Sequence, residues 1–247
     1  MLNLISSVLK QIIPFFIFIV VFNSCTSEFK PVIFKTTSID IAYEADISIE
    51  YDKAIGNDEL SKTVNFNVEK SIIGTLNNAE KKTSLNAVLE DFNSEFVAFK
   101  RGFPDASEPV WELYIETEKT YQSEDLITIA ISTYEFKGGA HGNDKIKFIN
   151  LNAKTGDIID RDAIIEDIEG FKKLANTYFI KSLDTEDKDQ NMEDLFFGKP
   201  FQLPENIGYS DDGLILLYNV YEVASYDQGY TEFVIPFDEA NTYLKFN

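Results

Sequence analysis

The feature that most constrains the fold is a change in hydrophobic period along the chain. Residues 58–76 and 84–100 carry apolar side chains at the three-to-four-residue spacing of amphipathic helices. Between residues 110 and 157 the pattern changes to alternating apolar and polar residues, which is typical of strands with one buried face. Helices and strands are therefore grouped along the chain, which favours an α+β fold over alternating β-α-β folds.

The predicted element order is strand, helix, helix, three strands, helix, two strands. We therefore expect antiparallel sheets packed with about three helices. The expected strands cover residues 38–54, 110–122, 125–136, 145–157, 213–225 and 230–237, and the expected helices cover residues 58–76, 84–100 and 162–182. Asn57 is the expected N-cap of the first helix. Gly102 and Pro104 predict a division into an N-terminal α+β subdomain, residues 38–105, and a C-terminal one, residues 106–247.

The composition narrows the class of partner. The 247 residues are 44% hydrophobic and 14% aromatic, which suffices for a sizeable core. The 42 acidic and 22 basic residues give a net charge of −20, which repels phosphate backbones, so we expect no nucleic-acid partner. The same charge would attract a basic protein, although solubility also explains it. With so many acids, carboxylate pairs are inevitable and identify no catalytic site.

The N-terminal residues predict an export signal. Lys10 precedes an apolar run over residues 12–22, which is shorter than the roughly 20 residues of a membrane-spanning helix. The single cysteine, Cys25, follows directly after this run and Ser24. A lone cysteine forms no internal disulfide, and its position is typical of a lipid acceptor in a bacterial lipoprotein.

We therefore expect residues 1–24 to be a lipoprotein signal peptide, Cys25 to be lipidated, and residues 25–37 to form a tether. An uncleaved membrane anchor over residues 2–22 is the alternative. Either arrangement predicts an extracytoplasmic protein anchored to a bacterial membrane, in the periplasm or at the cell surface.

The only histidine, His141, lies in a glycine-rich turn over residues 138–143. Glycine and asparagine readily adopt positive φ angles, so a turn explains the glycines without a ligand. Zinc requires three or four ligands, and with no second histidine we expect no metal and no cofactor. Nucleophilic catalysis requires a serine or cysteine beside the histidine, and no Gly-x-Ser-x-Gly motif occurs. We expect His141 to bond to its own turn, and a general base beside a carboxylate stays open.

Aromatic residues are frequent in the predicted strands. They include Trp111, Tyr114, Tyr134, Tyr218, Tyr221, Tyr226 and Tyr230. Aromatic side chains bind sugars and protein loops well, although we expect most of these to lie in the core. A groove lined by two or three of them is a further hypothesis.

Two separated motifs resemble a known family. The first is STYEFKGGAHGN, residues 132–143, in which a tyrosine strand leads into the Gly-His-Gly turn. The second is YNVYEVASYDQGYTEFVIPF, residues 218–237. Together they resemble the extracytoplasmic domain of unknown function shared by the anti-sigma factor RsiV, a lysozyme receptor, and the N-terminal part of the peptidoglycan deacetylase PdaC.

The resemblance implies an α+β fold and a surface that binds lysozyme or peptidoglycan glycan without catalysis. The motif residues that would form this surface are Tyr134, Gly139, His141, Asn143, Tyr221, Glu222 and Tyr226. In this sequence no cytoplasmic segment precedes the hydrophobic run and no catalytic domain follows Asn247. We therefore expect neither anti-sigma signalling nor deacetylation.

Taken together, these features predict a lipid-anchored, extracytoplasmic, non-catalytic binding protein. Its expected partner is a basic wall hydrolase such as lysozyme, or a cell-wall glycan. Two alternatives stay open: an enzyme that modifies wall polymers with His141 and a carboxylate, and a structural subunit of the envelope.

Overall fold

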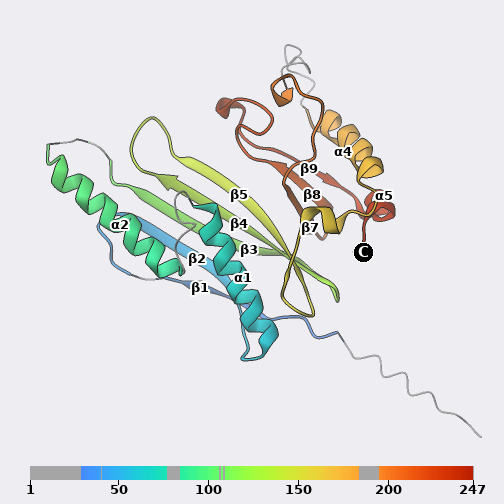
Figure 1. The fold of residues 1–247 in the computed structure, drawn as a ribbon, viewed down its shortest axis with the longest axis horizontal. Coiled ribbons are helices and arrows are strands. Elements are labelled where there is room, and N and C mark those ends of the chain that lie inside the picture. The colour runs from blue at the N-terminus through green and yellow to red at the C-terminus, as the bar shows by residue number, and fades with distance from the viewer. Residues whose placement is uncertain are drawn as a thin grey trace, which may run out of the picture.

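The computed structural model describes residues 29–39, 41–76, 84–105, 107, 109–183 and 195–246. The described chain forms a large sheet and a small sheet, each packed against helices (Figure 1). The expected signal peptide and Cys25 lie outside these ranges, so export and lipidation stay predictions. Within these ranges no helix has both the length and the apolar character that crossing a membrane requires.

The large sheet has six strands in chain order. They are β1 (Phe34–Ser38), β2 (Asp46–Ala54), β3 (Glu112–Gln122), β4 (Leu126–Phe136), β5 (Asn143–Asn152) and β6 (Ile158–Ile159). Neighbouring strands are antiparallel, except that β2 and β3 are parallel. The parallel pair follows from the connection between them, because both long helices of the N-terminal half lie between β2 and β3 in the sequence.

The small sheet and the remaining helices follow in the C-terminal part. The small sheet is antiparallel and contains β7 (Asn206–Ser210), β8 (Gly213–Tyr218) and β9 (Thr231–Ile235). The α-helices are α1 (Glu59–Thr75), α2 (Leu85–Gly102), α3 (Arg161–Ile164), α4 (Ile168–Ser182) and α5 (Phe237–Ala240), with 3-10 turns η1 (Leu195–Gly198), η2 (Tyr226–Gln228) and η3 (Asn241–Tyr243). The predicted α+β class is confirmed, and two structures with the same fold are described below.

Helices α1 and α2 cover one face of the large sheet (Figure 1). The predicted stripe of α1 is fully buried at Val64, Val68 and Ile72. It packs in the first core with sheet residues such as Leu113 and Ile129. Burial of this apolar stripe, more than helix propensity, stabilises a helix of this length.

The N-caps explain where these helices begin. The Asp58 carboxylate accepts a hydrogen bond from Ser61 N at 2.7 Å, and the Ser84 hydroxyl accepts one from Ala87 N at 3.3 Å. The predicted cap at Asn57 is wrong by one residue. Asp58 takes that place because its carboxylate satisfies a free N–H group in the first turn and is favoured by the helix dipole.

The second core lies between the small sheet and α4. Phe171, Ala175 and Phe179 of α4 are fully buried there, against strand residues such as Leu214 and Ile235. The helix predicted over residues 162–182 is instead two helices, α3 and α4. The break occurs because the Asp167 carboxylate accepts a hydrogen bond from Gly170 N at 2.9 Å and starts a new helix.

The two cores divide the chain at a different place from the predicted subdomain boundary at residues 105 and 106. The pairing of β2 with β3 crosses that boundary, and the first core runs from Ala45 to Ala153. The second core contains Leu126 and residues from Ile164 to Leu244. The large sheet therefore spans the predicted boundary, and, apart from Leu126, the change from the first core to the second comes between Ala153 and Ile164.

Several strands differ from the expected ranges. The strand predicted over residues 38–54 is β2, which begins only at Asp46. Four of the five residues of β1 lie in the predicted tether, and β1 pairs antiparallel with β2. The strand predicted over residues 145–157 begins at Asn143 and ends at Asn152, where the chain turns toward β6. The strand predicted over residues 213–225 ends at Tyr218, because Val223 turns into the second core rather than continuing the ladder. Strand β7 was not predicted.

A buried chain of hydrogen bonds joins the small sheet to the face of the large sheet that lies opposite α1 and α2. Thr128 Oγ1 of β4 donates to Asn150 Oδ1 of β5 at 2.7 Å, and Asn150 Nδ2 donates to Ile207 O of β7 at 2.8 Å. Tyr209 N donates to Thr128 Oγ1 at 3.3 Å. These polar groups are buried and paired with one another, so the network fixes the position of β7 on the large sheet.

Gly208 of β7 provides a test of how closely β7 packs against the large sheet. A Cβ atom at Gly208 would lie 2.6 Å from Cγ of the Phe148 ring on β5. We expect Gly208→Ala to lower the free energy of unfolding by about 1–3 kcal/mol, because the ring or the sheet must shift. Urea denaturation measures the change.

Gly74→Ala in α1 is the matched control. An added Cβ there meets no atom within 4 Å, so we expect this variant to be neutral or more stable by up to about 1 kcal/mol. Equal unfolding midpoints for the two variants would contradict the contact between the sheets.

Candidate functional site

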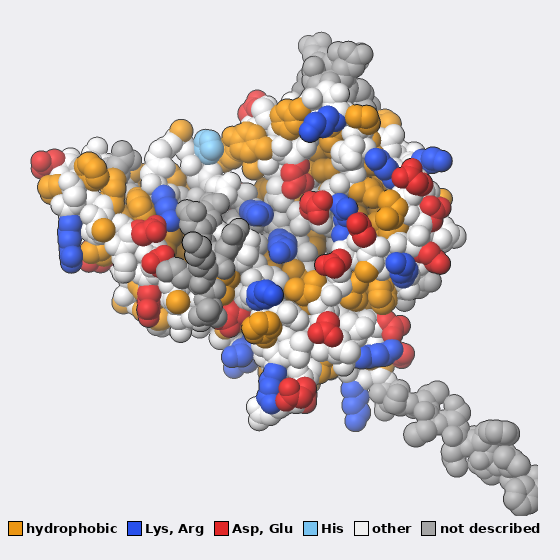
Figure 2. Space-filling model, in the orientation of Figure 1, with side chains coloured by type: hydrophobic (Ala, Val, Ile, Leu, Met, Phe, Trp, Pro, Cys, Tyr) orange, Lys and Arg blue, Asp and Glu red, His pale blue; other side chains and the backbone are white. Residues whose placement is uncertain are grey.

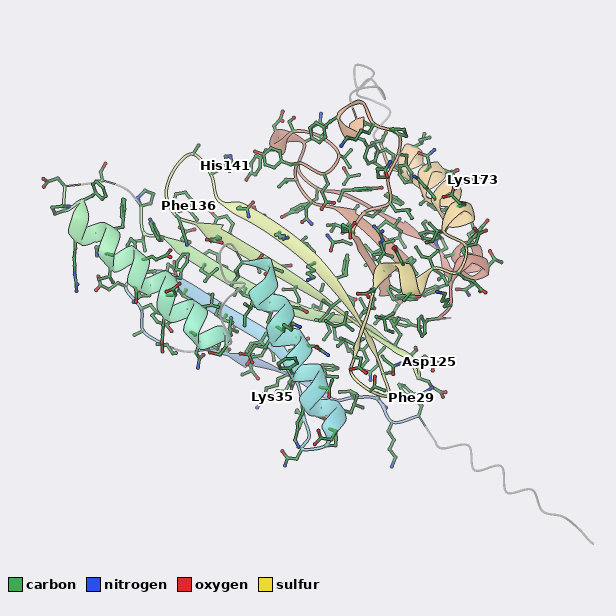
Figure 3. All side chains as sticks on the ribbon, viewed as in Figure 1. Phe29, Lys35, Asp125, Phe136, His141 and Lys173 are labelled. Atoms are coloured by element: carbon green, nitrogen blue, oxygen red, sulfur yellow. The ribbon has the colours of Figure 1, made fainter. Side chains whose placement is uncertain are left out.

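The glycine turn between β4 and β5 lies at one end of the large sheet. Figure 3 places His141 and Phe136 at this end and Asp125 at the opposite end. Gly138 and Gly139 have φ angles of 89° and 101°, which glycine adopts without strain. These two glycines therefore have the predicted backbone role.

Gly142 has a different role, which is to let a tyrosine ring approach the backbone. A Cβ atom at this position would overlap the Tyr134 ring of β4. Gly142 is buried, and Tyr134 is half-buried against it. The Tyr134 ring is stacked in turn on the Tyr114 ring of β3, with centroids 5.7 Å apart and planes at 17°.

His141 is exposed at the surface, where Figure 2 shows its imidazole. Its ring stacks on the Tyr226 ring with centroids 4.0 Å apart and planes at 19°. His141 Nδ1 lies 2.9 Å from Gly142 O, and the Tyr226 hydroxyl donates to the same oxygen at 3.3 Å. Because a carbonyl only accepts hydrogen bonds, Nδ1 carries a hydrogen in this arrangement. These contacts join the turn to the loop after β8, and none of them is with a carboxylate.

Asn219 fixes the loop after β8 to the edge of β5. Its side chain accepts a hydrogen bond from Ile146 N at 2.8 Å and donates one to Ile146 O at 2.9 Å. The amide thereby satisfies main-chain groups that a further strand would otherwise bind. Asn219 is buried, so this double contact positions the residues that follow it.

The loop after Asn219 carries the second sequence motif. Tyr221 has a φ angle of 68° and an exposed ring that lies 5.8 Å from the Tyr226 ring. Glu222 N donates to Asn219 O at 3.1 Å. The pKa of the Glu222 carboxyl is raised, chiefly because nearby protein displaces water from it, and hydrogen bonds from Asn219 oppose the rise.

The structure brings together most of the residues that the family resemblance indicated. Tyr134, His141 and Tyr226 contact Gly142 or one another, with Tyr221 and Glu222 in the adjoining loop. Asn143 begins β5 opposite Glu135. Gly139 stands apart, since an added Cβ there meets no atom within 4 Å. Whether these residues bind a ligand stays a prediction.

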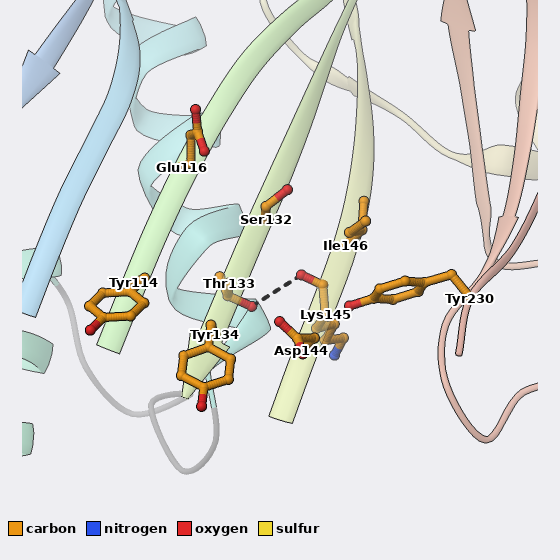
Figure 4. A pocket seen from close by; sticks show the side chains of 9 residues that line it. All are labelled: Tyr114, Glu116, Ser132, Thr133, Tyr134, Asp144, Lys145, Ile146 and Tyr230. Carbon is orange, nitrogen blue, oxygen red and sulfur yellow. Dashed lines mark hydrogen bonds between the residues drawn. The ribbon is translucent and has the colours of Figure 1, made fainter. Parts of the chain in front are cut away.

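A cavity of about 310 Å³ opens beside this cluster, on the sheet face opposite the helices (Figure 4). Its lining includes Tyr114, Glu116, Ser132, Tyr134, Asp144 and Tyr230. The first five come from β3, β4 and β5, and Figure 4 shows the Tyr230 side chain reaching in from the small-sheet side. Three tyrosines of the predicted aromatic set therefore line a cavity, whereas Trp111 and Tyr218 are buried in the cores.

A second cavity of about 270 Å³ adjoins the first across β3. It is lined by Ser48 and Glu50 of β2 and shares Tyr114 and Glu116 with the larger cavity. The shared residues Tyr114 and Glu116 place the two cavities side by side on one face of the sheet. We call the two cavities together the sheet groove, and it crosses β2, β3, β4 and β5.

Acidic side chains are concentrated along the sheet groove. They are Asp46, Glu50, Glu112, Glu116 and Asp144, on alternating positions of β2, β3 and β5. Lys145 is the basic residue in the lining. Strand alternation directs its side chain to the opposite face of β5 from Asp144, and its charge acts on Glu222. The lining of the groove therefore carries a net negative charge.

Tyr114 and Asp46 form the hydrogen bond that orders the β2 side of the sheet groove. The Tyr114 hydroxyl donates to Asp46 Oδ2 at 2.9 Å. This bond is the main reason that the pKa of Tyr114 rises from 10.0 to about 12. The pKa of Tyr134 is also raised, by desolvation first and then by Glu112 and Asp144. The surroundings of the groove thus raise the pKa of both tyrosines.

The acidic residues of the sheet groove were not singled out from the sequence, although their alternation with apolar residues could have indicated them. In DISIEYD of β2 and ELYIETE of β3, acids or other polar residues alternate with buried apolar residues. This alternation places the acids on one face. Within the described ranges, no group of three or more His, Cys, Asp or Glu side chains is arranged to hold a metal ion.

The fold and the groove together define an α+β domain with a half-covered, acidic sheet face. Two family models match this chain. The model described as Deacetylase PdaC matches residues 40–144, and the model described as Protein of unknown function (DUF3298) matches residues 156–238. The resemblance inferred from the two motifs is therefore confirmed. The first match contains β2 to β4 of the sheet groove, and the second contains the loop after β8.

Solved structures show the same fold. A DUF3298 family protein from Pseudomonas aeruginosa PAO1 has a TM-score of 0.63 and 23% identity, covering 87% of this chain and 95% of that one. A DUF3298 family member from Bacteroides fragilis has a TM-score of 0.67 and 18% identity, covering 88% and 96%. No curated protein gives a significant match.

Asn219→Ala tests the role of this residue in holding the loop. We expect the variant to lose about 1–3 kcal/mol of unfolding free energy, because Ile146 N and O would be left without protein partners at a partly buried site. The control is Asn143→Ala, whose side chain is exposed and makes no hydrogen bond within the described residues, with an expected change within about 0.5 kcal/mol. Equal thermal and urea stability of the two variants would contradict this role.

The Tyr114 pKa gives a pH-dependent test. Since the folded protein holds this proton more tightly than the unfolded chain, the bond to Asp46 stabilises the fold below about pH 10 and is lost as pH rises through about 12. We expect Asp46→Asn to lower the pKa of Tyr114 toward 10.0, as followed by the Tyr114 Cζ chemical shift. An unchanged titration in this variant would show that Asp46 does not raise the pKa.

Proposed function

We propose that this protein is an extracytoplasmic, non-catalytic binding domain that captures a cationic protein on its sheet groove. A basic wall hydrolase of the lysozyme type is the partner class. The observation that carries the proposal is the concentration of carboxylates and tyrosines on an uncovered sheet face. A sheet face that only contributes to a core is apolar. In the large sheet the face toward α1 and α2 is apolar, whereas the opposite face carries the carboxylates and tyrosines.

The charge of the groove supports a protein partner over a wall glycan. Glu50, Glu116 and Asp144 would attract lysine and arginine side chains, and tyrosine rings add cation–π and stacking contacts. Peptidoglycan carries carboxylates on its lactyl groups and stem peptides, and the groove would repel these. The net charge of −20 would also speed the approach of a basic protein over long distances.

Export and anchoring form part of the same proposal. The apolar run over residues 12–22 and Cys25 directly after it support a lipid-anchored protein outside the cytoplasm. The resemblance to extracytoplasmic domains supports the same location. A partner that attacks the cell wall would then be met where it acts.

The contacts of His141 favour binding over catalysis. Its Nδ1 is engaged with Gly142 O, and its ring is stacked on Tyr226. With the hydrogen on Nδ1, Nε2 still has the free lone pair of a base. The ring is nevertheless held by stacking, and none of the contacts described above is with a carboxylate that would orient a catalytic imidazole. In the proposed role His141 joins the turn to the loop after β8.

The proposal is tested by the association rate of the full chain, in a non-ionic detergent, with a c-type lysozyme. We expect the rate constant to fall on the order of tenfold between about 50 and 200 mM salt, because screening weakens the attraction. A rate constant that does not change with salt, or no binding at all, would contradict the proposal. Peptidoglycan fragments are tested in parallel, and tight binding to them alone would replace the protein partner with a glycan.

A further inference from the structure

We infer that the sheet groove binds an extended peptide segment with basic side chains at positions i and i+2, one in each of its two cavities. The inference rests on the proposed function and adds the chemistry and spacing of the bound segment. It is carried by the two adjoining cavities, the acids at each of them, and the distance between neighbouring strands.

The larger cavity has the walls that a planar cation requires. Tyr134 and Tyr230 provide aromatic rings, Glu116 and Asp144 provide carboxylates, and Ser132 provides an exposed hydroxyl. In Figure 4, Tyr230 approaches Asp144 from the small-sheet side. A guanidinium group can stack on a tyrosine ring while its N–H groups bind a carboxylate. The volume of about 310 Å³ is near the lower limit for ligand pockets, which suits a side chain rather than a folded loop.

The smaller cavity contains two carboxylates in a mutually unfavourable position. Glu50 of β2 and Glu116 of β3 are register partners on the same face, and both are exposed. Like charges directly across neighbouring strands destabilise a sheet. A basic side chain between them would remove this repulsion, so the pair favours a cation at this position. Ser48 and Tyr114 complete the lining.

The distance between the cavities indicates the spacing of the two basic residues. The smaller cavity lies over β2 and β3, and the larger lies over β3, β4 and β5. With strands about 4.8 Å apart, their centres are separated by roughly 7–10 Å. In an extended peptide, side chains at i and i+2 point the same way and are about 6.6 Å apart. Flexible arginine or lysine side chains can span the remaining difference, and residue i+1 faces solvent.

Two peptides of equal charge test the spacing. We would titrate the full chain, in non-ionic detergent, with acetyl-Gly-Arg-Ser-Arg-Gly-amide and with acetyl-Gly-Arg-Arg-Ser-Gly-amide by calorimetry. Because both peptides carry two arginines, long-range attraction is the same for both. We expect the first peptide to bind at least about threefold more tightly, since only its arginines point to the same face.

Glu116→Gln tests the location, because Glu116 lines both cavities. This residue is exposed, so the variant is expected to fold. We expect binding of the first peptide to weaken by about tenfold and the preference between peptides to disappear. Glu50→Gln should also weaken binding of the first peptide. Asp212→Asn, in the exposed turn after β7, makes the same change in net charge away from the groove, and we expect it to change neither affinity by more than about twofold.

The outcomes separate the inference from the proposed function. Salt-dependent lysozyme binding together with equal affinity for the two peptides would overturn the spacing and leave the proposed function standing. Lack of binding to lysozyme and to both peptides would contradict the proposed function itself. Binding of N-acetylglucosamine oligomers that Glu116→Gln abolishes, with no peptide binding, would overturn the inference in favour of a glycan.

Discussion

The buried hydrogen bonds between Thr128, Asn150 and the main chain of β7 determine how much of the large sheet is covered. They attach the small sheet near the start of β4 and the end of β5, and Asn219 adds a second attachment at Ile146. Because buried polar groups are costly when unpaired, these contacts fix one arrangement of the two sheets. The end of the sheet near the glycine turn is left open.

Partial coverage explains the chemistry of the open face. The helix side of β2 and β3 is apolar and buried under α1 and α2, whereas the alternate positions face solvent. Carboxylates can occupy those positions because no second layer covers them. The Tyr114 and Tyr134 rings stack on this face, and the Tyr134 ring packs directly against Gly142. These contacts join the open face to the glycine turn. The sheet groove and the two sequence motifs are therefore parts of one surface.

The sequence predicted the helices and strands more accurately than the way in which they pack together. Apolar periodicity identified α1 and α2 to within a few residues, since Val64, Val68 and Ile72 must share one face. The break at Asp167 depends on a cap, and Tyr221 leaves the strand pattern because Val223 packs into the core. Hydrophobic periodicity does not indicate where a helix cap or a core contact ends a helix or strand. The family motifs indicated Tyr134, His141 and Tyr226 together, whereas the acids of the sheet groove became visible only once β2 was paired with β3.

Hydrogen–deuterium exchange of the full chain with and without a c-type lysozyme tests the central claim most directly, because it locates the binding surface. Our account predicts slower exchange in β3 to β5 around Tyr114, Tyr134 and Asp144, and in the loop around Tyr226, with no change in α1 and α2. Protection confined to the helices, or none anywhere despite saturating lysozyme, would contradict the assignment of the sheet groove as the binding site.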